Sequence, residues 1–269
     1  MLMKSIDQCP ICGGGSTFIA NVRTIACRDD VLVPLCSCVV CGHWWHSLIP
    51  SQHELNTMYQ TASPFVVTEG AKDAYQVKRK NNFKKFVLDH IGEKEVGGNY
   101  LEIGAGGGHL LSDFRRQGFS TYGVEPAQWV KDKDIYPTLD DVPAGLGFNV
   151  LVLQDVLEHI AQPIEILSCL RKRAEDDALL FCSFPCNESR PAKRDREKWS
   201  MVLPYGHLHY FSYKSASEML LQAGWKIVDQ RMASPVSLLT IISERNWRAF
   251  AYELVKGSKD QLYLVASAS

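Results

Sequence analysis

The sequence predicts an α/β fold, a mostly parallel β-sheet flanked by helices, preceded by a small cysteine-rich module. Three observations predict it: strands alternate with helices after residue 97, a glycine-rich turn follows the first of these strands, and two Cys-x-x-Cys pairs lie within the first fifty residues. Helices between successive strands pack on both faces of a parallel sheet. We therefore expect a metal-binding ribbon at 1–50, a linker and helix at 51–96, and the α/β domain at 97–269.

Composition limits the classes of function. The 269 residues are 46% hydrophobic and carry a formal net charge of −1, so no overall charge attracts the chain to nucleic acid or an anionic membrane. Residues 1–10 contain no apolar signal region, and no apolar run reaches the length of about 20 residues that spans a bilayer. We expect a cytoplasmic protein without a membrane segment; its oligomeric state is left open.

The local patterns place the elements along the chain. Helical periodicity runs from Ala71 to Ile91, with Phe83, Phe86 and Val87 on one face. Ser215 and Glu218 have the spacing of a capping box, and Gly224 suits the end of the same helix. Two other helices are expected over 109–117 and through 164–170. The expected strands are 100–103, 120–124, 148–153, 178–184, 225–230 and 261–266.

The turn after the first strand of the α/β domain has the spacing of a nucleotide-type binding loop. Gly104, Gly106 and Gly108 alternate along it, which lets the backbone turn sharply and approach a ligand closely. The third glycine of the dehydrogenase pattern G-x-G-x-x-G would fall on His109, so a dehydrogenase-type loop is disfavoured. Glu125, seventeen residues after Gly108 at the end of the second strand, is placed to accept hydrogen bonds from ribose hydroxyls.

With these motifs, residues 97–267 resemble the class I S-adenosylmethionine-dependent methyltransferases, particularly the branch that modifies sugars and small molecules. The matching segments are Leu101–Gly108, Glu125, the string DVLEHI from Asp155 and the string HLHYFS from His207. The resemblance implies a seven-stranded Rossmann-like sheet and S-adenosylmethionine as cofactor. It also implies that Glu102 holds the cofactor's amino group, and that Gln154 and Asp155 lie near its methionine end.

Two positions depart from that family. Asn149 stands where the family usually has a structural aspartate at a strand start. The short stretch from Glu125 to Phe148 offers only Asp140 as a candidate for the acid that contacts adenine.

The N-terminal cysteines have the spacing of a zinc site. Six of the nine cysteines precede residue 42, and clustered pairs in a reducing compartment are typical of metal binding. Each of two pairs is followed by a glycine that permits the tight turn around one metal. We expect one structural zinc ion, because four thiolates leave no position for water. Cys36 and His43 rank lower as ligands, and Cys27 is expected to be an ordinary thiol. The four expected ligands are Cys9, Cys12, Cys38 and Cys41.

Three histidines are candidate bases for the reaction. His207 and His209 follow the fifth strand on the expected substrate side, and His159 comes next in rank. A neutral imidazole accepts a proton near physiological pH. For each of them, a hydrogen-bonded histidine with a structural role is an equally open interpretation. The basic residues at 188–205 fit either an anion on the acceptor or a solvated loop.

Three functions are consistent with these features. The favoured one is methyl transfer to a polar small-molecule acceptor, with a sugar or sugar-containing metabolite as the favoured class. An RNA methyltransferase with a zinc-ribbon reader is the second, but the charges within residues 1–50 are nearly balanced, so nucleic acid is an unfavoured partner. A non-catalytic S-adenosylmethionine-binding protein is the third, and the intact glycine loop argues against it.

Overall fold

The computed structural model describes residues 3–23, 31–51, 54–55, 57, 60, 74–91, 97–127, 130, 132–204, 206–233 and 260–269. Cys27 lies outside these residues. No helix among the described residues is long and apolar enough to cross a bilayer.

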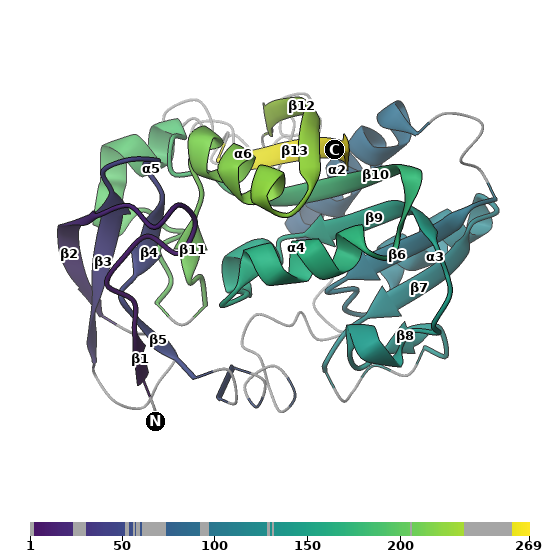
Figure 1. The fold of residues 1–269 in the computed structure, drawn as a ribbon, viewed down its shortest axis with the longest axis horizontal. Coiled ribbons are helices and arrows are strands. Elements are labelled where there is room, and N and C mark those ends of the chain that lie inside the picture. The colour runs from purple at the N-terminus through teal and green to yellow at the C-terminus, as the bar shows by residue number, and fades with distance from the viewer. Residues whose placement is uncertain are drawn as a thin grey trace.

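The larger sheet has seven strands in the order β12-β13-β10-β9-β6-β7-β8 (Figure 1). The central strands run parallel, and β13 lies antiparallel between β10 and β12. The predicted seven-stranded, mostly parallel sheet is confirmed. Its strands are β6 (Asn99–Ile103), β7 (Ser120–Val124), β8 (Ile135–Tyr136), β9 (Phe148–Gln154), β10 (Ala174–Pro185), β12 (Trp225–Ala233) and β13 (Gln261–Ala268).

Helices cover both faces of this sheet, as its strand sequences require. Along β9, Val150 and Val152 pack in one apolar cluster, and Leu151 and Leu153 pack in another on the opposite face. Helices α2 (Ala74–His90) and α3 (His109–Arg116) contribute to the first cluster. Helices α4 (Pro163–Arg171) and α6 (Tyr213–Gln222) contribute to the second.

Asn149 keeps the sheet connection that an aspartate would make at its position. Its Oδ1 accepts a hydrogen bond from the backbone N–H of Asn99, 3.0 Å away, at the start of β6. The Asn99 side chain in turn donates to the carbonyl of Gly147 (2.8 Å). An amide oxygen therefore serves here, because the partner is a neutral N–H that needs only an acceptor.

The smaller sheet joins distant parts of the chain. Its order is β11-β4-β3-β2, in which β2 (Ser16–Arg23), β3 (Leu32–Cys38) and β4 (Trp44–His46) come from the N-terminal region. The fourth strand, β11 (His209–Tyr210), comes from the α/β region and pairs antiparallel with β4. A separate pair joins β1 (Met3–Ser5) to β5 (Leu48–Pro50). Figure 1 shows β11 beside β4 within the N-terminal sheet.

The structure corrects the predicted start of helix α6. The capping box predicted at Ser215 and Glu218 is wrong: Ser212 is the N-cap of α6 and exchanges hydrogen bonds with Ser215. Ser215, at the third helical position, accepts a hydrogen bond from the Ser212 N–H, as a capping-box residue does. The helix therefore begins at Tyr213. Gly224 follows its end with φ of +82°, as expected. The remaining short helices are α5 (Arg190–Asp195), η2 (Leu139–Asp141), η3 (Leu157–His159) and η4 (Arg196–Lys198).

Candidate functional site

The glycine loop connects β6 to α3 and adopts the conformation that its glycines allow. Gly104, Gly106 and Gly108 have φ values of +71°, +52° and +72°, in the left-handed region that favours glycine. A Cβ on Gly104 would lie 2.5 Å from Val156 Cγ2, whereas a Cβ on Gly106 would meet no atom within 4 Å. The space beside Gly106 is therefore open, as a cradle for a ligand must be.

Glu125 extends from the end of β7 into this loop. Its Oε2 accepts from the N–H of Gly106 (2.9 Å), and its Oε1 accepts from the N–H of Ala127 (3.1 Å). Two backbone donors thus fix the carboxylate at the carboxyl end of the sheet, beside the open face of the loop. Ligands of open α/β sheets bind at this edge.

Glu102 lies within β6, two residues before Gly104, and is 4% exposed. Burial raises the pKa of its carboxyl to about 8; Lys80 and the hydroxyl of Tyr100 lower that pKa, and Glu125 raises it. The Tyr100 hydroxyl donates to Glu102 Oε2 at 3.5 Å. Such an acid stays protonated at neutral pH until a cationic group approaches it.

The residue that directly follows β9 is strained. Asp155 has φ of +55°, and its Oδ1 accepts from the Ser183 hydroxyl (3.3 Å) on the neighbouring strand β10. A non-glycine residue held in this region costs free energy and often marks a functional site. Gln154 precedes it as the last residue of β9 and is half-buried. Asp140, the candidate for adenine, is exposed in η2.

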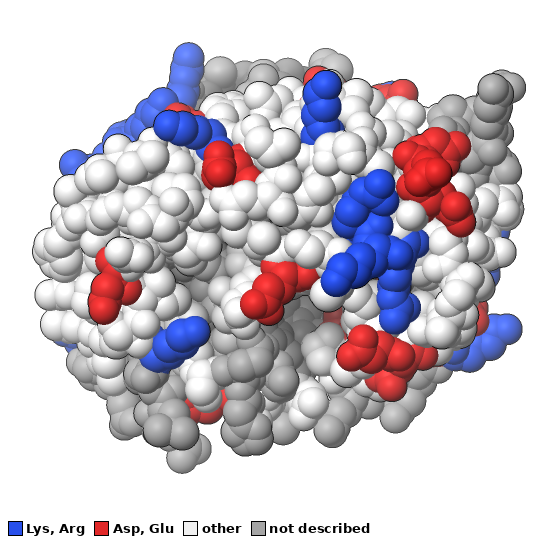
Figure 2. All heavy atoms as spheres, in the orientation of Figure 1, with Lys and Arg blue, Asp and Glu red and all other residues white. Residues whose placement is uncertain are grey.

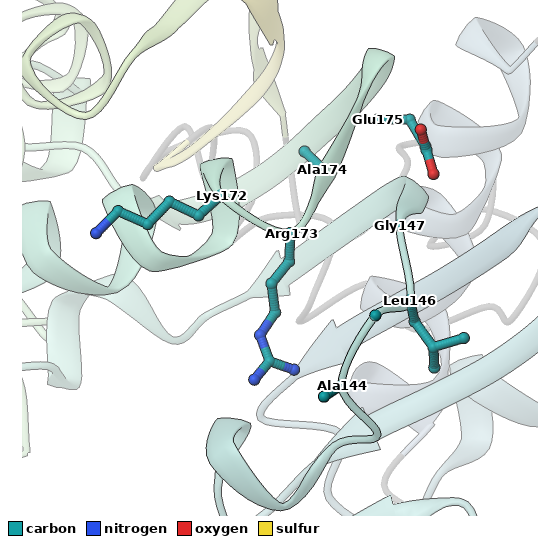
Figure 3. Close-up of a pocket in the computed structure, with 8 residues that line it drawn as sticks. Ala144, Leu146, Gly147, Lys172, Arg173, Ala174 and Glu175 are labelled. Atoms are coloured by element: carbon teal, nitrogen blue, oxygen red, sulfur yellow. The ribbon is translucent and has the colours of Figure 1, made fainter.

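The opposite edge of the sheet holds an open hollow of about 420 Å³, drawn in Figure 3. It is lined by 144–147, which lead into β9, and by 172–175, which lead into β10 and include its first two residues. The hollow therefore lies at the amino ends of these strands, away from the glycine loop. None of the predicted site residues lines it.

The four predicted cysteine ligands come together. Cys9 Sγ lies 3.6 Å from Cys41 Sγ, and Cys12 Sγ lies 3.4 Å from Cys38 Sγ, with all four sulfurs within 4.8 Å of one another. Four thiolates at about 2.3 Å from a tetrahedral zinc ion lie about 3.8 Å apart. The donor set and its spacing therefore fit zinc.

The two Cys-x-x-Cys turns are built alike. Gly13 N donates to the carbonyl of Cys9 (2.9 Å), and Gly42 N donates to that of Cys38 (3.1 Å). Both glycines have φ near +70°, which is the conformation that a glycine directly after the second cysteine permits. In the second turn the N–H groups of Val40 and Cys41 point at Cys38 Sγ, 3.4 Å away in each case.

Two of the predicted histidines meet at the carboxyl end of β9. His159 belongs to η3, which begins three residues after Gln154, and its ring packs edge-on against that of His207 with centroids 4.8 Å apart. The sequence analysis gave no role to Glu158, which is 1% exposed and contacts His159 Nε2 at 3.9 Å. Its position directly before His159 in the sequence was the signal that could have indicated a role.

His209, the third histidine, lies at a different place. It is 1% exposed, and its Nδ1 is 3.1 Å from Nε2 of His43, next to the cysteine turn. Burial lowers the pKa of His209 to about 4, so its imidazole is neutral at physiological pH. His43 was considered as a lower-ranked metal ligand, and the structure places it against this ring.

The comparison with protein families decides the class. Residues 75–230, more than half of the chain, match the family model described as a methyltransferase domain. The chain belongs to this methyltransferase family. The enzyme is accordingly an S-adenosylmethionine-dependent methyltransferase. No curated protein matches it.

Solved structures share the fold of this methyltransferase at low identity. A Burkholderia thailandensis 1,6-didemethyltoxoflavin-N1-methyltransferase aligns with a TM-score of 0.57 and 12% identity, covering 93% of this chain and 100% of that one. A putative methyltransferase in complex with the Haloferax volcanii Trm112 activator aligns with a TM-score of 0.54 and 16% identity, covering 74% of this chain and 93% of that one. A Mesorhizobium loti S-adenosylmethionine-dependent methyltransferase aligns with a TM-score of 0.51 and 13% identity, covering 68% of this chain and 96% of that one.

Alanine at two positions of the glycine loop should separate binding from stability. Gly106→Ala puts a methyl group into the open cradle, so affinity for S-adenosylhomocysteine should fall about tenfold or more, with a stability loss of about 1–2 kcal/mol from its positive φ. Gly104→Ala should destabilise the fold further, because its methyl group collides with Val156. Calorimetric titration and thermal unfolding measure the two effects. Unchanged affinity of Gly106→Ala would exclude the loop as the cofactor site.

Cofactor binding should release a proton from Glu102. The carboxyl is mostly protonated at pH 7 in the free enzyme, since its pKa is raised to about 8. A ligand ammonium group beside it favours the carboxylate and lowers that pKa, so the proton leaves on binding. Calorimetry at pH 7 in buffers of different ionisation heat should show this release in the wild type and a smaller release in Glu102→Gln. Equal release from the two proteins would contradict the assignment.

Proposed function

We propose that this methyltransferase transfers the methyl group of S-adenosylmethionine to a polar small molecule, of which a sugar or sugar-containing metabolite is the favoured class. Bound S-adenosylmethionine supplies an electrophilic methyl group: its C–S bond breaks as the bond to the acceptor forms, and the electron pair stays on sulfur. The remaining requirements are to hold the acceptor in line and to remove its proton.

For the cofactor we propose the residues that the glycine loop and the strand ends bring to one edge. Glu125 would accept from the ribose hydroxyls, and Glu102 would pair with the amino group. The open space at Gly106 supports this placement. The strained Asp155 lies at the same edge of the sheet, at the end of β9. The full proposed set is Glu102, Gly104, Gly106, Gly108, Glu125, Gln154 and Asp155.

The cluster of Glu158, His159 and His207 carries the proposal for the acceptor side. It lies at the carboxyl end of β9, directly after the proposed cofactor residues. We favour His207 and His159 as the groups that activate the acceptor. His209 stays a candidate of lower rank, because its ring is buried against His43 at the cysteine module.

RNA is the less favoured acceptor. On the face drawn in Figure 2, Lys and Arg side chains lie in several separate groups, and the group right of centre has Asp and Glu groups on either side. Binding of a nucleic-acid backbone needs a surplus of cations along one surface. A small acceptor needs no such surface.

We also propose that Cys9, Cys12, Cys38 and Cys41 hold one structural zinc ion. Their spacing supports it, and so do their surroundings, because three of the four are buried in the apolar cluster shared with α6. The Ser212 hydroxyl, the N-cap of α6, donates to the carbonyl of Cys41 (2.5 Å). The Asn187 amide donates to the carbonyls of Gly42 (2.8 Å) and Tyr210 (3.0 Å). The zinc ion would thus fix a turn on which the acceptor side rests.

Loss of the zinc ion should impair methyl transfer more than cofactor binding. Cys38→Ser removes one of four ligands, so metal analysis should find less than one zinc per chain and turnover should fall, while S-adenosylhomocysteine still binds at the glycine loop. Cys169→Ser is the control, because Cys169 is an exposed thiol. Full zinc content in Cys38→Ser would disprove the ligand set.

Removal of the His207 imidazole should lower the rate and spare the cofactor. His207→Ala is expected to reduce turnover roughly 10²- to 10⁴-fold with nearly unchanged S-adenosylhomocysteine affinity. His90→Ala is a matched control: the His90 Nδ1 also bonds a backbone carbonyl, that of Phe86, but within α2. Methyl transfer is measured on nucleotide-linked sugars, small phenols and RNA in parallel. Full activity of His207→Ala, or methylation of RNA alone, would refute this part of the proposal.

A further inference from the structure

The side chains of Glu158, His159 and His207 form a compact set of metal-ligand atoms outside the cysteine site. One ligand atom from each residue lies within 4.8 Å of the other two, and Glu158 Oε1 is 3.9 Å from His159 Nε2. Two of the residues are adjacent in η3, and the third comes from the segment that leads into β11. The set is therefore assembled by the tertiary fold and is not a chance of local sequence alone.

Backbone carbonyls orient both imidazoles. His159 Nδ1 lies 2.5 Å from the carbonyl oxygen of Gly206, and His207 Nδ1 lies 2.7 Å from that of Met201. A carbonyl only accepts, so each Nδ1 carries a proton, and in the neutral imidazole the lone pair is then on Nε2. Metal-binding histidines are typically held this way, with the distal N–H bonded to a carbonyl or carboxylate that fixes the ring.

The charge of the set also suits a cation. Glu158 is 1% exposed, and a buried carboxylate is costly unless an opposite charge accompanies it. Within the set, its Oε1 lies 3.9 Å from His159 Nε2. With both imidazoles neutral, the three groups together carry one negative charge, which a divalent cation would compensate.

The fold supports this ligand arrangement on both sides. The N–H of Leu208 donates to the carbonyl of Glu158 (2.7 Å), which ties the segment after His207 to η3. Val156, two residues before Glu158, packs against Gly104 of the glycine loop. The ligand atoms therefore belong to elements that border the proposed cofactor site.

We propose that Glu158, His159 and His207 bind a divalent transition-metal cation that holds an oxygen of the acceptor. Two imidazole nitrogens and one carboxylate oxygen suit Mn²⁺, Fe²⁺, Co²⁺ or Zn²⁺ and leave coordination positions open. Ligands about 2.1 Å from one ion lie about 3.0–3.5 Å apart, so binding draws the three side chains inward by about 1 Å. The inference rests on the proposed function and deepens it: with both Nε2 lone pairs on the cation, the cation would lower the pKa of the acceptor hydroxyl, whose proton would pass to water.

Metal titration of the full chain tests this site without reference to activity. Protein whose cysteines hold zinc is treated with a mild chelator and titrated with MnCl₂, and free Mn²⁺ is measured by its electron paramagnetic resonance signal. Wild type should bind one Mn²⁺ per chain in addition to the cysteine-bound zinc. Glu158→Gln and His207→Gln should each weaken this binding at least about tenfold. Glu165→Gln, an exposed carboxylate on α4, should leave it unchanged.

Retained zinc and S-adenosylhomocysteine binding show that each variant is folded. The wild-type titration also decides alone: absence of a second site for Mn²⁺, and for Zn²⁺ in a repeat, overturns the proposal whether or not the variants fold. Binding that persists in both variants overturns it as well. Metal binding with the expected losses, in an enzyme that methylates no sugar or small phenol, would support the site and reject the proposed acceptor class.

Discussion

The antiparallel pairing of β11 with β4 is the contact on which the proposed acceptor side of this enzyme depends. His209 pairs with Trp45 and Tyr210 with Trp44, so two residues of the methyltransferase region complete a sheet of the cysteine-rich region. His207 lies two residues before this strand, and the N–H of Leu208 connects the same segment to Glu158. The position of the histidine cluster therefore follows from a sheet whose other strands are more than 150 residues away in sequence.

Side-chain contacts reinforce that pairing on both sides. The Tyr210 hydroxyl lies 3.0 Å from His46 Nε2, and His43 Nε2 lies 3.1 Å from His209 Nδ1. All four side chains are buried. Buried polar groups that satisfy one another hold a specific geometry, because breaking one pair leaves its partner desolvated. The proposed cofactor edge is formed by other features: glycines with positive φ, a carboxylate held by two backbone N–H groups, and the strained Asp155. The proposed cofactor and acceptor sides are thus stabilised by separate contacts, and η3 lies between them.

The sequence predicted the elements whose information is local. Continuous apolar runs located the buried strands, and β7 begins and ends at the predicted residues Ser120 and Val124. The glycine spacing located the loop, because positive φ is a property of single residues. The cysteine spacing likewise brought the four sulfurs together.

Features that depend on distant partners were missed. Strands β8 and β11 have two residues each, too few for any periodicity, and exist only because a neighbouring strand accepts them. The start of α6 was misplaced because several serines in succession offer more than one capping register, and contact with the Cys41 carbonyl favours Ser212. No role was predicted for Glu158, because the fold brings it next to His207, which lies nearly fifty residues later in the sequence.

We propose that the cysteine site, with a bound zinc ion, holds the proposed acceptor side of the enzyme in place. Hydrogen exchange with mass spectrometry tests it directly on the full chain, before and after the cysteine-bound metal is removed. We predict faster exchange of the Leu208 and His46 amides, whose hydrogen bonds link η3, β11 and β4, and unchanged protection in β6 and β9. Undiminished protection of Leu208 and His46 in the metal-free protein would contradict the account.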